Sequence, residues 1–256
     1  MVEVTSYPPG TPAWVDLSTP DVAGACRFYG AVLGWGTQDT GPAGRGYVLF
    51  VVRGRTVAGV GPLAGTDQRP AWTTYVCVED ADASTAVARR AGAAVVLAPL
   101  DVLDAGRMAV LSDPTGATVA LWQPRGHPGA QLADEAGSCC GHELQTRDED
   151  AAVAFYGAVF GWAACPEHAD GRRATAWSSG GRRVAALVGM ADEVPLQVPA
   201  AWLPYFAVAD CDAAVARAVD GGGATLAGPA DGGRGRSAVL SDPCGAAFAV
   251  LAPAAP

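Results

Sequence analysis

The pattern of apolar and polar positions near the start of the chain predicts a strand followed by a helix. Residues 13–18 form a short apolar segment, and Asp21 after Thr19-Pro20 is typical of a helix N-cap. From there to Gly34, a stop signal, apolar side chains recur at helical spacing. These side chains are Val22, Ala25, Phe28, Tyr29 and Val32. Two strands are expected next, at 46–52 and 55–61, with a turn at Arg53-Gly54.

The same order then restarts within the first half of the chain. A strand is expected at 72–78 and a helix at 80–91 that ends at Gly92. Three further strands are expected at 94–99, 107–112 and 117–122. The first half therefore reads as two βαβββ units.

The second half repeats the first, with matches spread over its whole length. Eight residues recur 127 positions later: Asp21, Phe28, Tyr29, Gly30, Ala31, Val32, Gly34 and Trp35 become Asp148, Phe155, Tyr156, Gly157, Ala158, Val159, Gly161 and Trp162. Further matches join Trp72–Tyr75 to Trp202–Tyr205, Gly106-Arg107 to Gly235-Arg236, and Ser112-Asp113-Pro114 to Ser241-Asp242-Pro243. Such spread indicates duplication rather than a shared short motif. We expect an α+β protein of four βαβββ units, with domains at 8–123 and 138–254 and a linker at 124–137.

Composition sets the class of protein. Half of the 256 residues are hydrophobic and 17% are charged, which favours a folded chain with a sizeable core. No apolar stretch reaches the length of a membrane span, and the first residues lack the pattern of a signal peptide. The seven cysteines include no CxxC pair, which fits a reducing compartment. We therefore expect a cytoplasmic protein without a membrane partner, either a monomer or a homodimer.

Charge excludes several kinds of chemistry. The net charge is −9 and all 17 basic residues are arginine. Without a clustered cationic face, no nucleic-acid partner is expected. Without lysine, Schiff-base chemistry, lysine-bound pyridoxal phosphate and a P-loop are excluded, because each needs an ε-amino group.

Three features resemble the vicinal-oxygen-chelate superfamily: the helix with its FYGAV.GW motif, the later SDP.GA turn and the paired βαβββ order. That superfamily includes glyoxalase I, extradiol dioxygenases and the bleomycin- and fosfomycin-resistance proteins. The resemblance covers about 12–123 and 138–253, and it is closest to duplicated actinomycete members, some of which occur beside aromatic-polyketide pathways. It implies two tandem glyoxalase-like domains, each with a cupped mixed sheet whose concave face holds the ligand.

The resemblance also implies where metal ligands would stand. These places hold Trp14, Thr73 and Ala120 in the first half and Gly141, Leu203 and Ala249 in the second. The strands that would carry a fourth, acidic ligand, 55–62 and 182–190, contain no acid. His142 is next to a ligand place, so in a strand it should face the opposite side. Because divalent metals need His, Gln, Glu or similar donors, neither a metal nor another cofactor is predicted.

Counting by twos from these places predicts which side chains share the concave face. The candidates for ligand binding are Trp14, Tyr75, Trp122, Cys139, Gly141 and Tyr205, with Arg107 and Arg236 as a recurring pair of cations. Aromatic side chains beside small ones suit a flat, partly apolar ligand. Aromatic residues on sheets are also common in protein cores, so both interpretations stay open.

Asp16 and Glu143 occupy equivalent places, two residues after the vacated ligand positions. A carboxylate on an apolar face could take a raised pKa and act as an acid or a base. Alternatively, each could have a structural duty and be satisfied by a backbone amide or by Arg107 or Arg236. Cys139 and Cys77 could act as nucleophiles only beside a base, and none is evident.

Two functions follow from these residues. The first is a metal-independent binding protein for an aromatic, polyketide-like natural product or intermediate, acting in resistance, sequestration or biosynthesis. The second is a metal-independent isomerase, cyclase or hydrolase with Asp16 or Glu143 as the tentative acid or base. A metal-dependent lyase or dioxygenase is disfavoured by the missing ligands. The identity of the ligand, and the half that binds it, do not follow from the sequence.

Overall fold

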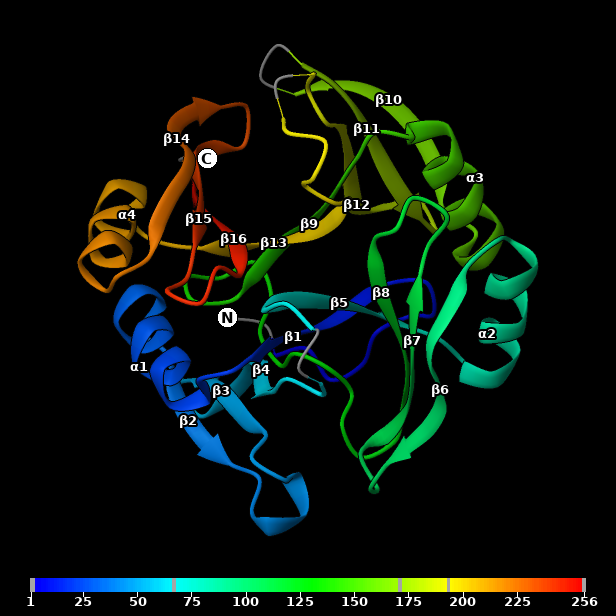
Figure 1. Cartoon of the computed structure of the whole chain (residues 1–256), viewed down its shortest axis with the longest axis horizontal. Helices are drawn as coiled ribbons and strands as arrows, with labels where there is room; N and C mark the ends of the chain where they lie inside the picture. Colours follow the sequence, from blue (N-terminus) through cyan, green and yellow to red (C-terminus); the bar gives the residue numbers. More distant parts are fainter. Residues whose placement is uncertain (1–2, 66–67, 170–171, 193, 255–256) are drawn as a thin grey trace.

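The computed structural model describes residues 3–65, 68–169, 172–192 and 194–254, without the side chains of 168–173. Four βαβββ units follow one another along the chain (Figure 1). The first comprises β1 (Pro12–Thr19), α1 (Val22–Leu33), β2 (Gly36–Asp39), the short 3-10 helix η1 (Pro42–Gly44), β3 (Val48–Val52) and β4 (Arg55–Pro62). The second comprises β5 (Ala71–Cys77), α2 (Ala81–Arg90), β6 (Ala94–Val102), β7 (Gly106–Ser112) and β8 (Thr118–Pro124).

The second half has the same order. Its first unit comprises β9 (Cys139–Thr146), α3 (Glu149–Phe160), β10 (Ala163–Ala169), β11 (Arg172–Ser179) and β12 (Arg182–Gly189). The last unit comprises β13 (Ala201–Ala207), α4 (Cys211–Asp220), β14 (Ala224–Gly232), β15 (Gly235–Ser241) and β16 (Ala247–Pro253). None of the described helices is both long and apolar enough to cross a membrane.

Each half forms one eight-stranded mixed sheet. The strand orders are β2-β3-β4-β1-β5-β8-β7-β6 and β10-β11-β12-β9-β13-β16-β15-β14, so the two halves have the same topology. In each sheet the first strands of the two units pair antiparallel at the centre. Each of these central strands also pairs in parallel with the last strand of its own unit. The predicted α+β fold of duplicated βαβββ units is confirmed.

The recurring helix motif has a capping function. Asp21 accepts a hydrogen bond from the Gly24 amide, and Asp148 does the same for Ala151 at the start of α3. Both helices end at a glycine in the left-handed region, with φ of 74° at Gly34 and 68° at Gly161. A side chain with a Cβ is disfavoured in that conformation, which explains the recurring stop.

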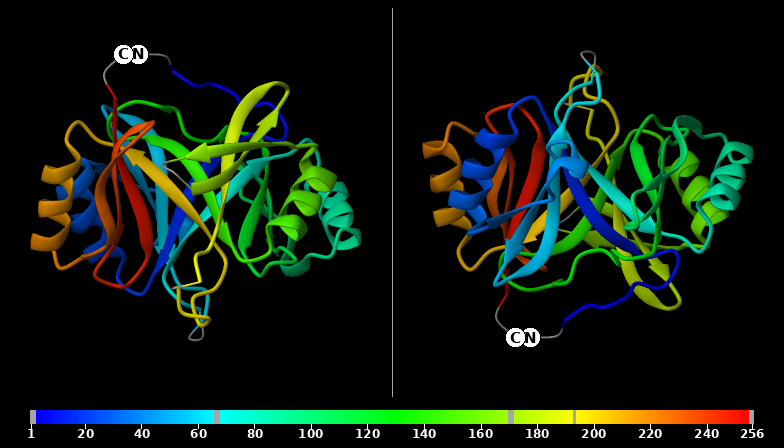
Figure 2. Two further views of the ribbon diagram at one scale, coloured as in Figure 1. Left: turned by 90° about the horizontal axis from the view of Figure 1, so that it is seen from above. Right: turned by 90° about the horizontal axis from the view of Figure 1, so that it is seen from below.

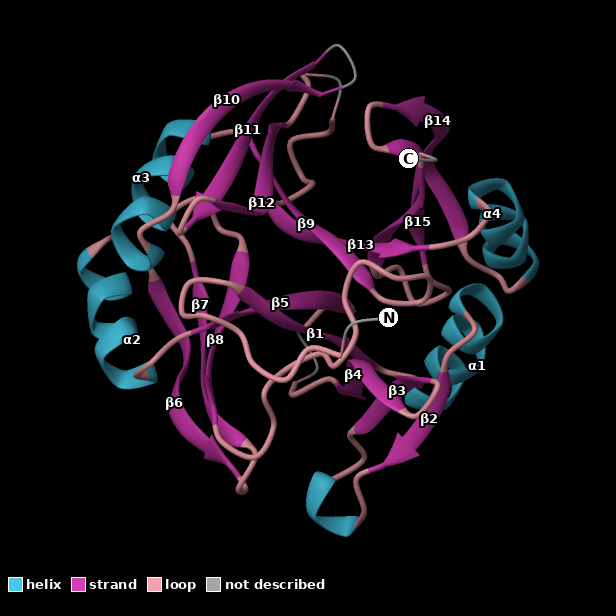
Figure 3. Ribbon diagram, turned by 180° about the vertical axis from the view of Figure 1, so that it is seen from behind, coloured by secondary structure: helices cyan, strands magenta, loops and turns pink. Residues whose placement is uncertain are grey.

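The two cores combine units from different halves. One core joins α1 and its strands to α4 and the strands of the last unit, and the other joins the second and third units. The helices accordingly pair as α1 with α4 and α2 with α3 at opposite ends of the molecule, with the strands between them (Figures 2 and 3). The concave face of each sheet lies on the side away from these helices.

The recurring tyrosine and aspartate join the halves within these cores. Tyr29 donates a hydrogen bond to Asp242 at 3.2 Å and accepts one from Trp72 at 2.9 Å. In the other core, Tyr156 donates to Asp113 at 2.8 Å and accepts from Trp202 at 2.7 Å, both bonds being buried. The aspartate of each SDP turn thus binds the FYG tyrosine of the other half. These motifs recur because they build the fold.

One strand of the first half differs from expectation. Strand β2 was not predicted, because all four of its residues are exposed and carry no apolar signal. The linker segment is packed against the first half: Ala130 and Leu132 are buried, and the Gln131 side chain accepts a hydrogen bond from the Thr56 amide. The segment therefore forms part of the surroundings of the first concave face.

Candidate functional site

The strand registers place rows of side chains on the first concave face. One row runs Trp14, Tyr75, Ala120, Val110, Leu97 across five strands. A neighbouring row runs Trp122, Met108, Leu100. Trp14, Tyr75 and Trp122 are 5–7% exposed because they pack in one cluster with Ala120 and linker residue Ala130. Leu97 and Leu100, at the edge strand, are 38% and 37% exposed. The face therefore has a closed aromatic centre and an open apolar wall.

A polar cluster lies beside the aromatic centre, around Asp16. The Tyr75 hydroxyl donates to Asp16 Oδ2 at 2.9 Å, and the Tyr47 hydroxyl donates to the same oxygen at 3.2 Å. Trp14 Nε1 in turn donates to the Tyr47 oxygen at 3.1 Å. Among the described residues, Asp16 Oδ1 has no hydrogen-bond partner. One carboxylate oxygen is thus held by tyrosines while the other stays available.

Burial raises the pKa of Asp16 to about 6, although the hydrogen bonds from Tyr75 and Tyr47 oppose the shift. Desolvation penalises the charged form of an acid, and a single carboxylate among aromatic rings has little water to stabilise it. Burial and the nearby Asp16 charge raise the pKa of both tyrosines well above the ordinary value. The cluster therefore contains a carboxyl group that changes protonation near neutral pH, with two hydroxyls that remain protonated.

This shift predicts a pH-dependent cost to stability. Because the folded-state pKa of Asp16 lies above its ordinary 3.8, its contribution to stability is fully present below pH ~4 and is lost as the pH rises through about 6. A full linkage calculation would overstate the loss, since Asp16 is partly exposed. We expect the free energy of unfolding of the wild type, relative to Asp16→Asn, to fall by about 1–2 kcal/mol between pH ~4 and ~7.5. Urea titrations across this range measure it, and a difference independent of pH would contradict the shift.

The second concave face repeats the carboxylate–tyrosine pair with other neighbours. The Tyr205 hydroxyl donates to Glu143 Oε2 at 3.1 Å, and Gln145 Nε2 donates to Oε1 at 2.9 Å. Tyr47 has no counterpart here, because Ala174 stands at the equivalent place 127 positions later. Glu143 thus keeps the tyrosine but gains an amide in place of the second hydroxyl.

Arg234 adds a cation to the second face. It lies in the turn between β14 and β15, and its Nη2 donates to the Cys140 carbonyl at 2.7 Å. Its guanidinium carbon is 5.7 Å from the Tyr205 ring centroid, in cation–π contact. The guanidinium also covers Gly141, where an added Cβ would meet its nitrogens at 3.0–3.1 Å. The positive charge therefore lies over the floor of the face.

Cys139 does not share this face, contrary to expectation. The register of β9 and β13 shifts between Tyr205 and Phe206, so Gly141 and Cys139 oppose two successive residues. Such a bulge breaks the alternation of side chains. Cys139 packs instead against the core, with its thiol 3.6 Å from His142 Nε2. Burial raises the pKa of the Cys139 thiol to about 12, which disfavours a reactive thiolate.

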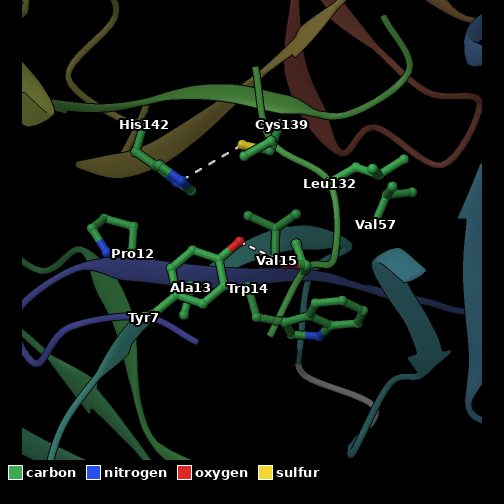
Figure 4. A pocket seen from close by; sticks show the side chains of 11 residues that line it. Tyr7, Pro12, Ala13, Trp14, Val15, Val57, Leu132, Cys139 and His142 are labelled. Carbon is green, nitrogen blue, oxygen red and sulfur yellow. Dashed lines mark hydrogen bonds between the residues drawn. The ribbon is translucent and has the colours of Figure 1, made fainter. Parts of the chain in front are cut away.

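Cys139 and His142 line a small cavity of about 50 Å³ between the two sheets. Figure 4 shows both side chains on one side of β1 and the Trp14 ring on the other, with Tyr7 facing His142. His142 Nδ1 is 3.3 Å from the buried Thr74 hydroxyl, and burial lowers the pKa of His142 to about 4. The expectation that His142 faces away from the concave face agrees with this position. The neutral imidazole packs between the halves.

Arg107 and Arg236, the recurring pair of cations among the ligand-binding candidates, lie away from the concave faces. Arg107 binds Asp82 at 2.7 Å and Asp101 at 3.1 Å, and Arg236 binds Asp212 at 2.7 Å and Asp231 at 3.2 Å. Arg107 neighbours Met108, which faces the concave side, so strand alternation turns Arg107 toward α2. The pair recurs because it joins each second helix to its edge strand, and neither arginine satisfies Asp16 or Glu143.

Three residues of these faces escaped the sequence analysis: Tyr47, His127 and Arg234. The His127 ring packs edge-on against Trp14 with centroids 4.5 Å apart, and its carbonyl accepts from Trp122 Nε1 at 2.9 Å. Tyr47 lies within the predicted strand 46–52, from which no counting was started, and it directly precedes β3 in the structure. His127 lies in the linker, and Arg234 lies in a turn. Counting along strands cannot find side chains that reach the face from outside it.

The side chains present do not fit a divalent metal at the places that the family resemblance implies. Trp14, Thr73, Ala120, Leu203 and Ala249 offer no carboxylate, imidazole or thiolate donor, and Gly141 has no side chain. Within the described ranges, no group of three or more His, Cys, Asp or Glu side chains is arranged to hold a metal ion.

Comparison with known proteins places the chain in a family. The model of a glyoxalase-like domain matches it twice, over residues 14–122 and 142–251. The chain belongs to the glyoxalase-like domain family. This glyoxalase-like protein is 42% identical to "Putative glyoxylase CFP32" of Mycobacterium bovis, with 99% of each chain covered. It is 40% identical to "Anthracycline biosynthesis protein DnrV" of Streptomyces peucetius, over 97% of this chain and 95% of that one.

Solved structures share the fold of this glyoxalase-like protein. The Mn(II)-bound glyoxalase from Novosphingobium aromaticivorans superposes with a TM-score of 0.66 at 15% identity, covering 95% of this chain and 82% of that one. The dioxygenase LapB from Pseudomonas sp. KL28 gives a TM-score of 0.62 at 15% identity, covering 100% and 94%. The resemblance to the vicinal-oxygen-chelate superfamily is confirmed at the level of the fold.

Proposed function

We propose that the chain is a metal-independent binding protein for an aromatic, polyketide-like small molecule and acts in the biosynthesis, sequestration or resistance of such a compound. One observation carries the proposal: the open apolar wall of the first concave face. Leu97 and Leu100 are more than a third exposed there, on the same face as the aromatic cluster, whose Tyr75 binds the Asp16 carboxylate. Flat apolar ligands gain affinity from such surfaces, and one polar group sets their orientation.

The 40% identity to an anthracycline biosynthesis protein supports the ligand class, since both halves of that relative are covered. Micromolar affinity corresponds to about −8 kcal/mol. Burial of apolar ligand surface at roughly 25 cal/mol per Å² could supply it even after the entropic cost of association. Asp16 Oδ1 offers one acceptor for a ligand hydroxyl, and its partner oxygen is already held by Tyr75 and Tyr47.

Doxorubicin, an anthracycline, provides a test. Titration should quench the tryptophan fluorescence in a saturable way, because Trp14 and Trp122 lie in the cluster behind the wall. Leu100→Asp should weaken binding at least tenfold, since it places a charge on the apolar wall; tenfold corresponds to about 1.4 kcal/mol. Leu226→Asp is the matched control, because Leu226 is also exposed on an edge strand but lies in the second sheet. Equal affinity of both variants would contradict the proposed face.

A second candidate function is favoured by the pKa of Asp16. A carboxyl group with a pKa near 6 and a free oxygen is suited to proton transfer at neutral pH, as an isomerase, cyclase or hydrolase would require. The Asp16→Asn variant distinguishes the two functions, with Glu143→Gln as its counterpart in the second half. Normal binding with loss of conversion to a new product would make Asp16 catalytic. Normal binding without any conversion by the wild type would leave the carrier function.

A further inference from the structure

The two concave faces differ systematically in the size of their side chains. Bulky residues of the first face are replaced by small ones at equivalent register positions of the second. The pairs are Trp14 and Gly141, Tyr47 and Ala174, Leu49 and Ala176, Leu97 and Ala227, Leu100 and Ala230, and Met108 and Ser237. The first face fills its centre with its own aromatic rings. On the second face the Arg234 guanidinium occupies the space over Gly141.

The second face also holds more charge. The Arg234 guanidinium lies over Gly141, near the Glu143–Tyr205 pair. Among the described contacts, its side chain uses one hydrogen bond, to the Cys140 carbonyl, so donors of the planar fork remain. No equivalent cation exists in the first half, where Ala105 precedes β7. This cation is therefore specific to the second face.

Arg234 is held in place by the face itself. Its guanidinium is in cation–π contact with Tyr205, whose hydroxyl is bound by Glu143, and Gln145 donates to the other oxygen of that carboxylate. The Arg234 charge also lowers the pKa of two neighbouring groups. Burial is the main cause of the lowered pKa of His142, and Arg234 adds to it. The hydrogen bond from Arg183 is the main cause for Glu167, and Arg234 again adds to it. A cation aimed over small residues, with free donors, is suited to a planar oxyanion.

We propose that the second concave face binds the oxyanion of a small aromatic acid, with the Arg234 guanidinium as the charged contact and Gly141 providing the space beneath it. The carboxylate or enolate oxygens of the ligand accept hydrogen bonds from the guanidinium donors that the Cys140 carbonyl does not use. The inference goes beyond the proposed function, because it adds a separate site for an aromatic acid on the second face, apart from the apolar wall of the first.

Salicylate and its neutral amide, salicylamide, test the charge requirement on the intact chain. We expect salicylate to bind the wild type by calorimetry and to lose at least tenfold in affinity in Arg234→Gln, whereas salicylamide affinity should not change between these proteins. Arg234→Lys should retain part of the salicylate affinity, because it keeps the charge without the fork. Arg125→Gln, which removes another exposed arginine, is the matched control and should bind as the wild type does.

A second variant tests the position of the guanidinium without removing its charge. Gly141→Ala places a methyl group 3.0 Å from Arg234 Nη2 and should displace the guanidinium, with a severalfold loss of salicylate affinity. Equal salicylate affinity in the wild type and Arg234→Gln would overturn the inference. Doxorubicin binding with no salicylate binding would overturn it while the proposed function stands. Binding of neither compound would count against both.

Discussion

Asp113→Ala is expected to lower the free energy of unfolding by about 3 kcal/mol, because it leaves several buried groups without partners. Asp113 is 4% exposed and accepts from Tyr156 at 2.8 Å, from the Thr115 amide at 2.8 Å and from the Ala117 amide at 3.0 Å. Each buried donor that loses its acceptor costs about 1–3 kcal/mol. The Tyr156 bond also crosses from one half to the other, so its loss weakens the contact between them.

Denaturant titration measures the free energy of unfolding of Asp113→Ala, which is compared with that of two further variants. Tyr156→Phe should cost about 1–2 kcal/mol, because it removes the hydroxyl but keeps the turn. Asp104→Ala, at an exposed turn position before β7, should change stability by about 0.5 kcal/mol or less. If Asp113→Ala cost no more than Asp104→Ala, the buried bond between the halves would have no part in stability. Asp242→Ala should reproduce the large effect through Tyr29 in the other core.

Gly59→Val should expel Tyr47 from the Asp16 cluster. The Tyr47 ring lies over Gly59 and Gly61 of β4, so closely that a Cβ at Gly59 would overlap the hydroxyl that binds Asp16. We expect a loss of about 1–3 kcal/mol in the free energy of unfolding from overpacking. Without the Tyr47 hydrogen bond, which lowers the pKa of Asp16, that pKa should rise above 6.

The control for this variant lies in the other half. Ala186→Val changes the equivalent strand position opposite Glu143, where Ala174 leaves no aromatic ring to displace. It should cost less stability than Gly59→Val. NMR titration of the Asp16 carboxyl carbon gives the pKa in the wild type, Gly59→Val and Tyr47→Phe. A pKa that is the same in all three proteins would show that Tyr47 does not stabilise the Asp16 carboxylate.

The fold could be predicted from the sequence because the second half repeats the first, so the same elements are predicted twice. Motifs such as FYGAV.GW and SDP recur in register, and each has a structural cause: a capped helix, a turn and a hydrogen bond between the halves. Strand β2 was missed because an exposed edge strand needs no apolar side chains. Apolar periodicity indicates which face of a strand is buried, so it gives no signal for a strand that has no buried face.

The candidate site was predicted only in part. Alternation correctly placed Asp16 and Tyr75 on one face and Glu143 and Tyr205 on the other, because β1, β5, β9 and β13 are regular at those positions. It failed at Cys139, where a bulge reverses the face. Arg107 was chosen because it recurs with Arg236, and that recurrence does not reveal its partners on α2 and β6. Tyr47 was missed because its place depends on Gly59 across a neighbouring strand.

The mixed cores have a consequence for how the chain can be divided. The first βαβββ unit shares its core with the last, and the second with the third, so a boundary drawn at the linker cuts through both cores. An isolated half would expose one side of each core to water. Two separately expressed halves should therefore recognise each other and reassemble without a covalent connection, as complementary fragments do. The order of the units along the chain therefore differs from the order in which they pack against one another.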